Sequence, residues 1–66
     1  MPALQSSNIA SADYDDDTGE MTVEFRNGSE YAGAVPKEVY EGLISSHSPG
    51  QYYFRNIRDV YPMRRV

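Results

Sequence analysis

The stretch MTVEFRNGSEYAGAV, residues 21–35, decides the predicted fold of this chain. Apolar side chains occupy every second position before Asn27-Gly28, and Tyr31, Gly33 and Val35 continue the alternation after it. This period of two is typical of half-buried strands, and Asn-Gly between two such runs is a strong hairpin signal. The stretch therefore predicts two antiparallel strands, over residues 20–26 and 29–35, joined by a tight loop.

The length of that loop determines which side chains share a face of the sheet. A two-residue turn would place Phe25 opposite Glu30, and the apolar faces of the two strands would not coincide. A three-residue loop ending at Gly28 instead pairs Val23 with Tyr31, and the apolar faces then agree. Because a slip of one residue moves every side chain to the other face, we predict a type I turn with a G1 bulge and a positive φ at Gly28.

Two helices are predicted after the hairpin. Residues 37–46 carry apolar side chains at helical spacing, and Pro36 suits the first helical position because its missing N–H is not needed there. Ser48, with proline next and glutamine three residues on, is typical of a capped helix start. The second helix is predicted from Pro49 to about Val60, with an inward face of Tyr53, Phe54, Ile57 and either Val60 or Tyr61.

The predicted fold class is α+β, with a three-stranded antiparallel meander followed by two helices (β-β-β-α-α). The strands are expected over residues 6–14, 20–26 and 29–35, and a short C-terminal strand over Met63–Val66 is an additional candidate. Residues 1–5 are expected to be a flexible N-terminus, and residues 6–66 to form a single domain. The core is expected to include Val23, Phe25, Tyr31, Val35, Tyr40, Leu43, Tyr53, Phe54 and Ile57.

The size of the chain limits how it can be stabilised. A chain of 66 residues buries only about 60% of its unfolded surface, so its core is small. It contains no cysteine, so no disulfide can add stability. Self-association as a homo-oligomer, or a bound partner, would therefore be useful. No apolar run approaches the roughly 18 residues of a membrane span, and a cytoplasmic setting is expected.

The acidic stretch DYDDDTGE, residues 13–20, alternates aspartates as the first ligands of an EF-hand calcium loop do. Such a loop needs glycine at position six and an apolar residue at position eight. Thr18 and Glu20 stand at those positions, and a strand rather than a helix is expected next. The stretch is therefore predicted to be a hairpin turn. Its exposed carboxylates form a candidate acidic surface for a basic partner: Asp15, Asp16, Asp17 and Glu20.

Catalytic and cofactor motifs are absent from the sequence. His47 is the single histidine, and no G-x-S-x-G elbow accompanies it. Neither the P-loop pattern nor the dinucleotide-binding glycine pattern occurs. Without cysteines, one histidine does not make a conventional zinc site. We therefore predict no catalytic residues, no cofactor and no metal, and expect that the chain is not an enzyme.

The charge is unevenly distributed along the chain, whose net charge is −4. Residues 1–46 carry nine acidic and two basic residues, whereas residues 47–66 carry four arginines and one aspartate. Aromatic rings beside guanidinium groups are used in sequence-tolerant RNA binding, and the same residue types are common anchors of protein interfaces. The candidate binding surface therefore consists of Tyr52, Arg55, Arg58, Arg64 and Arg65.

The order of these signals resembles the KTSC domain, a short module named for its presence at the C-terminus of some lysyl-tRNA synthetases. The resemblance implies a stand-alone module of bacterial or phage origin, and for this family RNA binding has been suggested. One departure is that the family's central Tyr-x-Tyr reads Tyr31-Ala32-Gly33 here. The matching positions are Ser6-Ser7-x-Ile9, Tyr14-Asp15, Phe25-x-x-Gly28-x-x-Tyr31, Val35-Pro36-x-x-Val39-Tyr40-x-x-Leu43, Ser48-x-Gly50-x-Tyr52, Phe54, Ile57-Arg58 and Tyr61-Pro62.

Two functions follow as expectations. The favoured one is a small non-catalytic module that binds a protein partner, such as a phage-encoded accessory factor acting on a host protein. The alternative is an RNA-binding module that uses the aromatic and arginine residues of the C-terminal helix and tail. The acidic net charge weighs against RNA, because phosphate binding favours a basic surface.

Overall fold

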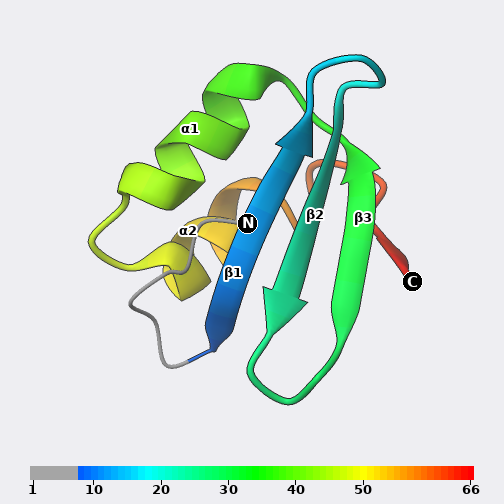
Figure 1. Ribbon diagram of the computed structural model, residues 1–66. Coiled ribbons are helices and arrows are strands. Elements are labelled where there is room, and N and C mark those ends of the chain that lie inside the picture. Colours follow the sequence, from blue (N-terminus) through cyan, green and yellow to red (C-terminus); the bar gives the residue numbers. More distant parts are fainter. Residues whose placement is uncertain (1–7) are drawn as a thin grey trace.

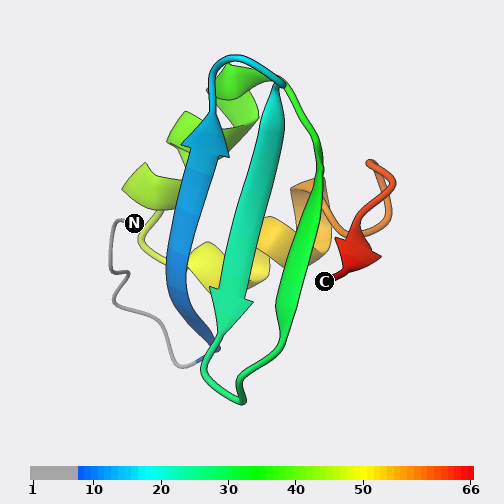
Figure 2. The same ribbon diagram turned by 45° about the vertical axis from the view of Figure 1, so that its right-hand side comes forward.

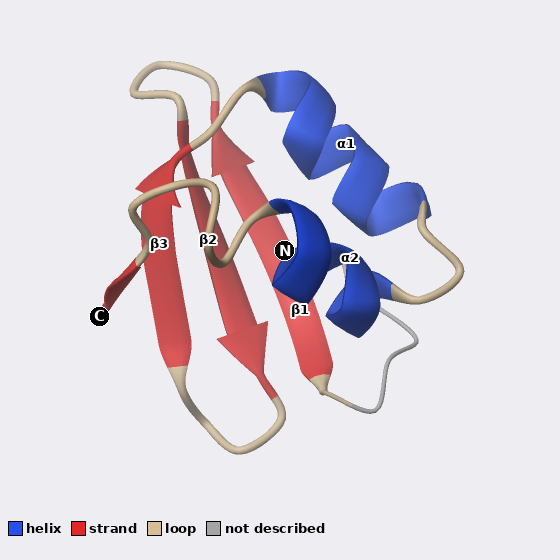
Figure 3. Cartoon of the chain, turned by 180° about the vertical axis from the view of Figure 1, so that it is seen from behind, coloured by secondary structure: helices blue, strands red, loops and turns tan. Residues whose placement is uncertain are grey.

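A computed structural model describes residues 8–66, so the predicted flexible segment 1–5 lies outside the described residues. A four-stranded antiparallel sheet in the order β1-β2-β3-β4 carries both helices on one face (Figures 1 and 3). The predicted α+β fold is confirmed, together with the short C-terminal strand. The elements are β1 (Ile9–Asp15), β2 (Glu20–Phe25), β3 (Glu30–Ala34), α1 (Lys37–Ser45), α2 (Pro49–Asn56) and β4 (Arg64–Arg65).

The β2–β3 hairpin has the predicted register and loop. Val23 pairs with Tyr31, and the N–H of Phe25 donates to the carbonyl of Ser29 at 2.8 Å. Gly28 has a φ of 93°, and its N–H donates to the Phe25 carbonyl at 3.0 Å. A side chain is disfavoured at such a φ, so glycine allows the three-residue loop that aligns the two apolar faces.

Strand β1 contains an irregularity that the sequence pattern did not predict. Its register against β2 shifts between Ile9 and Ser11. Because a bulge inserts one residue, Ile9 and Ala12 face the helices together although they are three residues apart. Ser11 then lies on the other face, where its hydroxyl donates to the Glu24 carboxylate at 3.3 Å. The strand ends at Asp15, one residue later than predicted, and residues 6 and 7 of its predicted start lie outside the described residues.

The core lies between the sheet and the two helices, and it differs from the predicted one. Ile9, Ala12 and Met21 are buried but were not in the predicted core. Conversely, Phe54 is 42% exposed, and Phe25, Tyr31 and Tyr40 are only half-buried. Tyr53 and Ile57 are one helical turn apart and both face the sheet, so Phe54 is rotated about 100° away from it. The buried hydrophobic residues are Ile9, Ala12, Met21, Val23, Ala32, Val35, Leu43, Tyr53 and Ile57.

The helix boundaries also need correction. Pro36 has an extended backbone and lies one position before α1, as its N-cap. Helix α2 begins at Pro49 as predicted, but the Ser48 side chain makes no capping hydrogen bond. The helix ends at Asn56 instead of about Val60, because Ile57 leaves helical geometry with φ −124° and ψ −53°. Val60 is consequently 61% exposed and forms no part of the inward face.

The C-terminal segment crosses the end of the helical layer and returns to the sheet as β4 (Figure 2). Gly33 makes this return possible, because a Cβ at position 33 would lie 2.8 Å from the Pro62 carbonyl oxygen and 3.2 Å from the Met63 Cα. The register of β4 pairs Arg64 with Ala32. Within residues 8–66, both helices are too short or too polar to cross a membrane.

Candidate functional site

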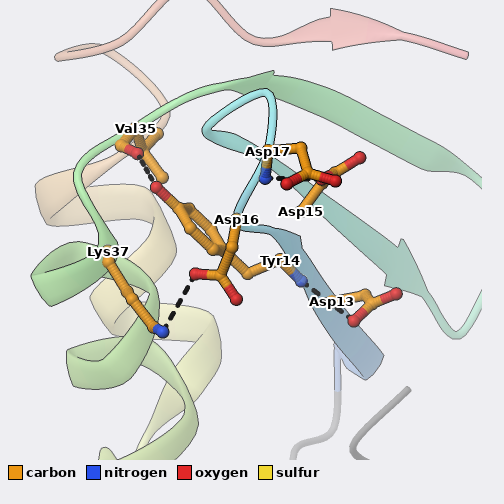
Figure 4. Close-up of polar contacts among 7 residues, drawn as sticks. All are labelled: Asp13, Tyr14, Asp15, Asp16, Asp17, Val35 and Lys37. Carbon is orange, nitrogen blue, oxygen red and sulfur yellow. Dashed lines mark hydrogen bonds and ion pairs between the residues drawn. The ribbon is translucent and has the colours of Figure 1, made fainter.

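The acidic stretch forms the β1–β2 turn, as predicted, and it is held by local hydrogen bonds (Figure 4). The N–H of Asp17 donates to the Asp15 carboxylate at 2.9 Å, and the Gly19 N–H donates to the Asp15 carbonyl at 2.8 Å. Asp16 forms an ion pair with Lys37 at 2.9 Å, which raises the pKa of the lysine. Within residues 8–66, no three histidine or carboxylate side chains are grouped as metal ligands would be. The structure therefore gives the turn an internal role in joining the sheet to the start of α1.

A tyrosine closes the end of the core beneath this turn. The Tyr14 hydroxyl donates to the Val35 carbonyl at 2.9 Å (Figure 4). Its ring stacks on Tyr40 of α1, with ring centroids 5.3 Å apart. The polar end of this half-buried side chain is thus paired, as most buried polar groups are. We call this region the closed end, defined by Tyr14, Val35, Lys37, Tyr40 and Asp16.

The fourth predicted acidic residue, Glu20, binds an arginine from the other candidate surface. Both guanidinium terminal nitrogens of Arg64 donate to the Glu20 carboxylate at 3.0 Å. This paired hydrogen bond lowers the pKa of Glu20. Glu20 lies on the sheet face opposite the helices, because its neighbour Met21 is buried in the core. Arg64 is therefore occupied within the chain.

The predicted basic and aromatic residues come from α2, the segment after it and β4, and they differ in exposure and contacts. Tyr52 is half-buried, and its hydroxyl lies against Gly42 of α1, where an added Cβ would overlap it. Arg55 is exposed in the last turn of α2, and Arg58 follows the helix. Arg65 is exposed and pairs with Tyr31 in the sheet ladder. Of these residues, Arg58 lines a cavity at the end of α2.

That cavity is an open cleft of about 480 Å³ between the β2–β3 hairpin and the end of α2. Its walls carry aromatic rings from both layers, and Met63 contributes from the segment before β4. Neither Phe25 nor Phe54 was predicted to line a site, since both were assigned to the core. We call this cavity the aromatic cleft, and its lining residues are Phe25, Asn27, Ser29, Tyr31, Tyr53, Phe54, Arg58, Asp59 and Met63.

The rings of the cleft form a chain of edge-to-face contacts. Phe25 contacts Tyr31 and Tyr53, with centroid separations of 5.6 and 5.2 Å. Tyr53 in turn contacts Phe54, at 5.9 Å. The Arg58 guanidinium lies 5.3 Å above the centre of the Phe54 ring. These contacts fix the apolar walls and hold the arginine over one of them.

The sequence contained one signal for this arrangement. Phe54 and Arg58 are four residues apart, a spacing that places side chains on the same side of a helical turn. The hairpin loop contributes the opposite wall, because the three-residue turn places Phe25 and Tyr31 on the helix-facing side of the sheet. What the spacing could not indicate is that α2 stops after Asn56 and leaves Phe54 uncovered.

The hydroxyl of Tyr53 is the most unusual polar group of the cleft. The side chain is only 3% exposed, yet its hydroxyl has no hydrogen-bond partner among residues 8–66. Every fully buried side-chain nitrogen or oxygen in that range does have a partner, so this hydroxyl is accessible to solvent, and Tyr53 is one of the residues that line the cleft. Burial and the nearby Tyr31 raise the pKa of Tyr53, whereas the Arg58 guanidinium lowers it. The Tyr53 and Tyr31 hydroxyls and the Arg58 guanidinium therefore lie near one another, and all three residues line the cleft.

Comparisons with known proteins agree with this architecture. The KTSC domain family model matches residues 5–61, which include every cleft residue except Met63. The crystal structure of a KTSC domain protein from Yersinia pestis superposes with a TM-score of 0.91 at 26% identity, covering 98% of this chain and 93% of that one. An uncharacterised protein of Stutzerimonas stutzeri strain A1501 is 40% identical over 52 residues, covering 77% of this chain and 73% of the relative. The chain belongs to the KTSC domain family.

Proposed function

We propose that this chain is a small non-catalytic interaction module that binds a protein partner through the aromatic cleft. The observation that carries the proposal is the exposure of Phe54 beside buried Tyr53, whose hydroxyl has no partner among residues 8–66. An aromatic ring left 42% exposed next to an unpaired polar group favours a site that is completed by a ligand. Aromatic residues and arginine are also the commonest anchors of protein interfaces.

The charges of the cleft favour a protein over RNA. Its lining contains one cation, Arg58, and one anion, Asp59. Arg64 of the basic tail is already paired with Glu20. Binding along a phosphate backbone needs several free cations on one surface, and the net charge of −4 opposes it. The RNA-binding alternative would therefore depend on Arg55, Arg58 and Arg65.

The test is capture of partners by the tagged full chain from a lysate of the organism that encodes it, with and without RNase. Phe54→Ser removes the exposed wall of the cleft, and Val60→Ser is the matched control because Val60 is also exposed but lies outside the cleft. We expect one RNase-resistant protein to be retained by the wild type and by Val60→Ser, and lost by Phe54→Ser.

Two results would count against this proposal. Capture that disappears with RNase, falls steeply with salt and requires Arg55 and Arg58 would favour the RNA-binding alternative. Equal capture by both serine variants would show that binding occurs elsewhere on the chain. Thermal unfolding of each variant checks that the lost capture does not reflect lost folding.

A further inference from the structure

The polar groups of the aromatic cleft are arranged to receive a hydrogen-bond acceptor. Tyr53 and Tyr31 present hydroxyls that have no partner among residues 8–66. Arg58 adds a guanidinium, whose nitrogens are donors only. Tyr53 is only 3% exposed and lines the cleft, so a group that enters the cleft is placed to pair with its hydroxyl.

From this geometry we infer that the cleft binds an acidic side chain, Asp or Glu, of a partner segment, with the carboxylate held by Tyr31, Tyr53 and Arg58. The inference rests on the proposed function, since it specifies what the protein partner supplies. Phe25 and Phe54 would contact the apolar part of that segment. Donors from two hydroxyls and one guanidinium match the acceptor-only chemistry of an ionised carboxylate.

The charge of the cleft points to a carboxylate rather than a phosphate. The lining carries one cation, Arg58, and one anion, Asp59, so it has no surplus positive charge, and Asp59 repels a phosphate more strongly than it repels a singly charged carboxylate. Phosphate groups carry close to two charges at neutral pH and are usually held by several cations. In the basic tail, Arg64 is bound to Glu20 on the far face of the sheet, and Arg65, which is opposite Tyr31 in the ladder, is not among the lining residues of the cleft.

The experiment measures binding of short blocked peptides to the purified full chain by NMR titration. The probes are acetyl-Leu-Glu-Leu-amide and its uncharged counterpart acetyl-Leu-Gln-Leu-amide. We expect the glutamate peptide to shift the ring resonances of Tyr31 and Tyr53, and to bind at least about tenfold more tightly than the glutamine peptide, as loss of a charge-assisted hydrogen bond implies.

Variants of the chain then locate the carboxylate. Tyr53→Phe removes only the hydroxyl, and Arg58→Met keeps most of the apolar stem but removes the charge. Each should reduce the affinity for the glutamate peptide to about that of the glutamine peptide. Arg55→Met is the control, because Arg55 is an exposed arginine of α2 that does not line the cleft.

Several results would overturn the inference. Equal binding of the two peptides, or binding that is unaffected by Tyr53→Phe and Arg58→Met, would do so while leaving the proposed function intact. Preference for a free C-terminal acid, acetyl-Leu-Gln-Leu, over the glutamate peptide would assign the carboxylate to a chain terminus instead. Tighter binding of inorganic phosphate than of either peptide would also contradict it. Absence of any shift with millimolar peptide would likewise count against the carboxylate site, and the capture experiment would then judge the function separately.

Discussion

The two ends of the core each place a tyrosine between the sheet and a helix, but only one of the two is paired. At the closed end, the Tyr14 hydroxyl donates to the Val35 carbonyl and the ring stacks on Tyr40. At the aromatic cleft, the Tyr53 hydroxyl has no partner within residues 8–66, and its neighbour Phe54 is exposed. The Tyr14 hydroxyl thus takes part in a hydrogen bond within the fold, whereas the Tyr53 hydroxyl remains available to a ligand.

The difference has a local cause in the chain. At the closed end, the ion pair between Asp16 and Lys37 links the β1–β2 turn to the start of α1. The cleft lies where α2 stops after Asn56 and the chain turns back toward the sheet. A helix of eight residues is too short to cover the hairpin end of the sheet. The availability of the cleft is therefore a consequence of where the second helix ends.

The largest effect on stability is expected from Ile57→Ala, which tests how much the core beside the aromatic cleft contributes to folding. Ile57 is fully buried and belongs to the same core cluster as Leu43 and Tyr53. Removing its side chain should lower the free energy of unfolding by about 2–5 kcal/mol, as for other large-to-small core changes. Urea denaturation measures this value. A loss below about 1 kcal/mol would mean that the end of α2 contributes little to the core.

A smaller loss is expected from Gly33→Ala, which disturbs the return of the chain beside the cleft. The added Cβ would meet the Pro62 carbonyl and the backbone of Met63, which cannot move away as a flexible side chain would. Overpacking of this kind should cost about 1–3 kcal/mol of unfolding free energy. Gly28→Ala would test a different effect, because a Cβ at position 28 meets no neighbouring atom but the backbone there has a positive φ that disfavours alanine. Full stability of Gly33→Ala would show that the C-terminal segment is easily displaced.

A matched pair of hydroxyl deletions compares the two ends directly. Tyr14→Phe leaves the Val35 carbonyl without its donor and should cost about 0.5–1.5 kcal/mol. Tyr53→Phe removes a hydroxyl that has no partner within the described residues, 8–66, and should change stability by less than about 0.5 kcal/mol. Thermal or urea unfolding of both variants checks the difference. Equal losses would indicate that Tyr53 is paired in solution and that the two ends are alike.

The smallest effect is expected from Arg64→Met, through the pH dependence of stability. Arg64 lowers the pKa of Glu20, so the pair stabilises the folded chain above the ordinary glutamate pKa. This contribution is lost as the pH falls through the lowered folded pKa. The stability difference between wild type and variant should therefore be small at neutral pH, vanish in acid and shrink with added salt, because the pair is exposed. A difference that persists in acid would refute this role of the ion pair.

The strand order, the hairpin register and the two helices could be predicted from the sequence. The residues that line the aromatic cleft could not. Strand alternation and the Asn27-Gly28 loop determined the hairpin register, since only one register aligns the two apolar faces. The bulge in β1 was not predictable, because the inserted residue interrupts the alternation on which the prediction depends. Phe54 was assigned to the core because helical spacing alone does not reveal where a helix ends. Its exposure depends on tertiary packing, and so does the cleft.

The Asp13 side chain affects whether two copies of this chain can pair through the edges of their sheets. Strands β1 and β4 form the edges of the sheet, and an exposed edge can template pairing with another molecule. The Tyr14 N–H in β1 is already occupied by the Asp13 carboxylate at 2.9 Å (Figure 4). Negative charges at Asp13 and Asp15 would also repel the same edge of a second copy. Both features disfavour edge-to-edge pairing of two copies through β1.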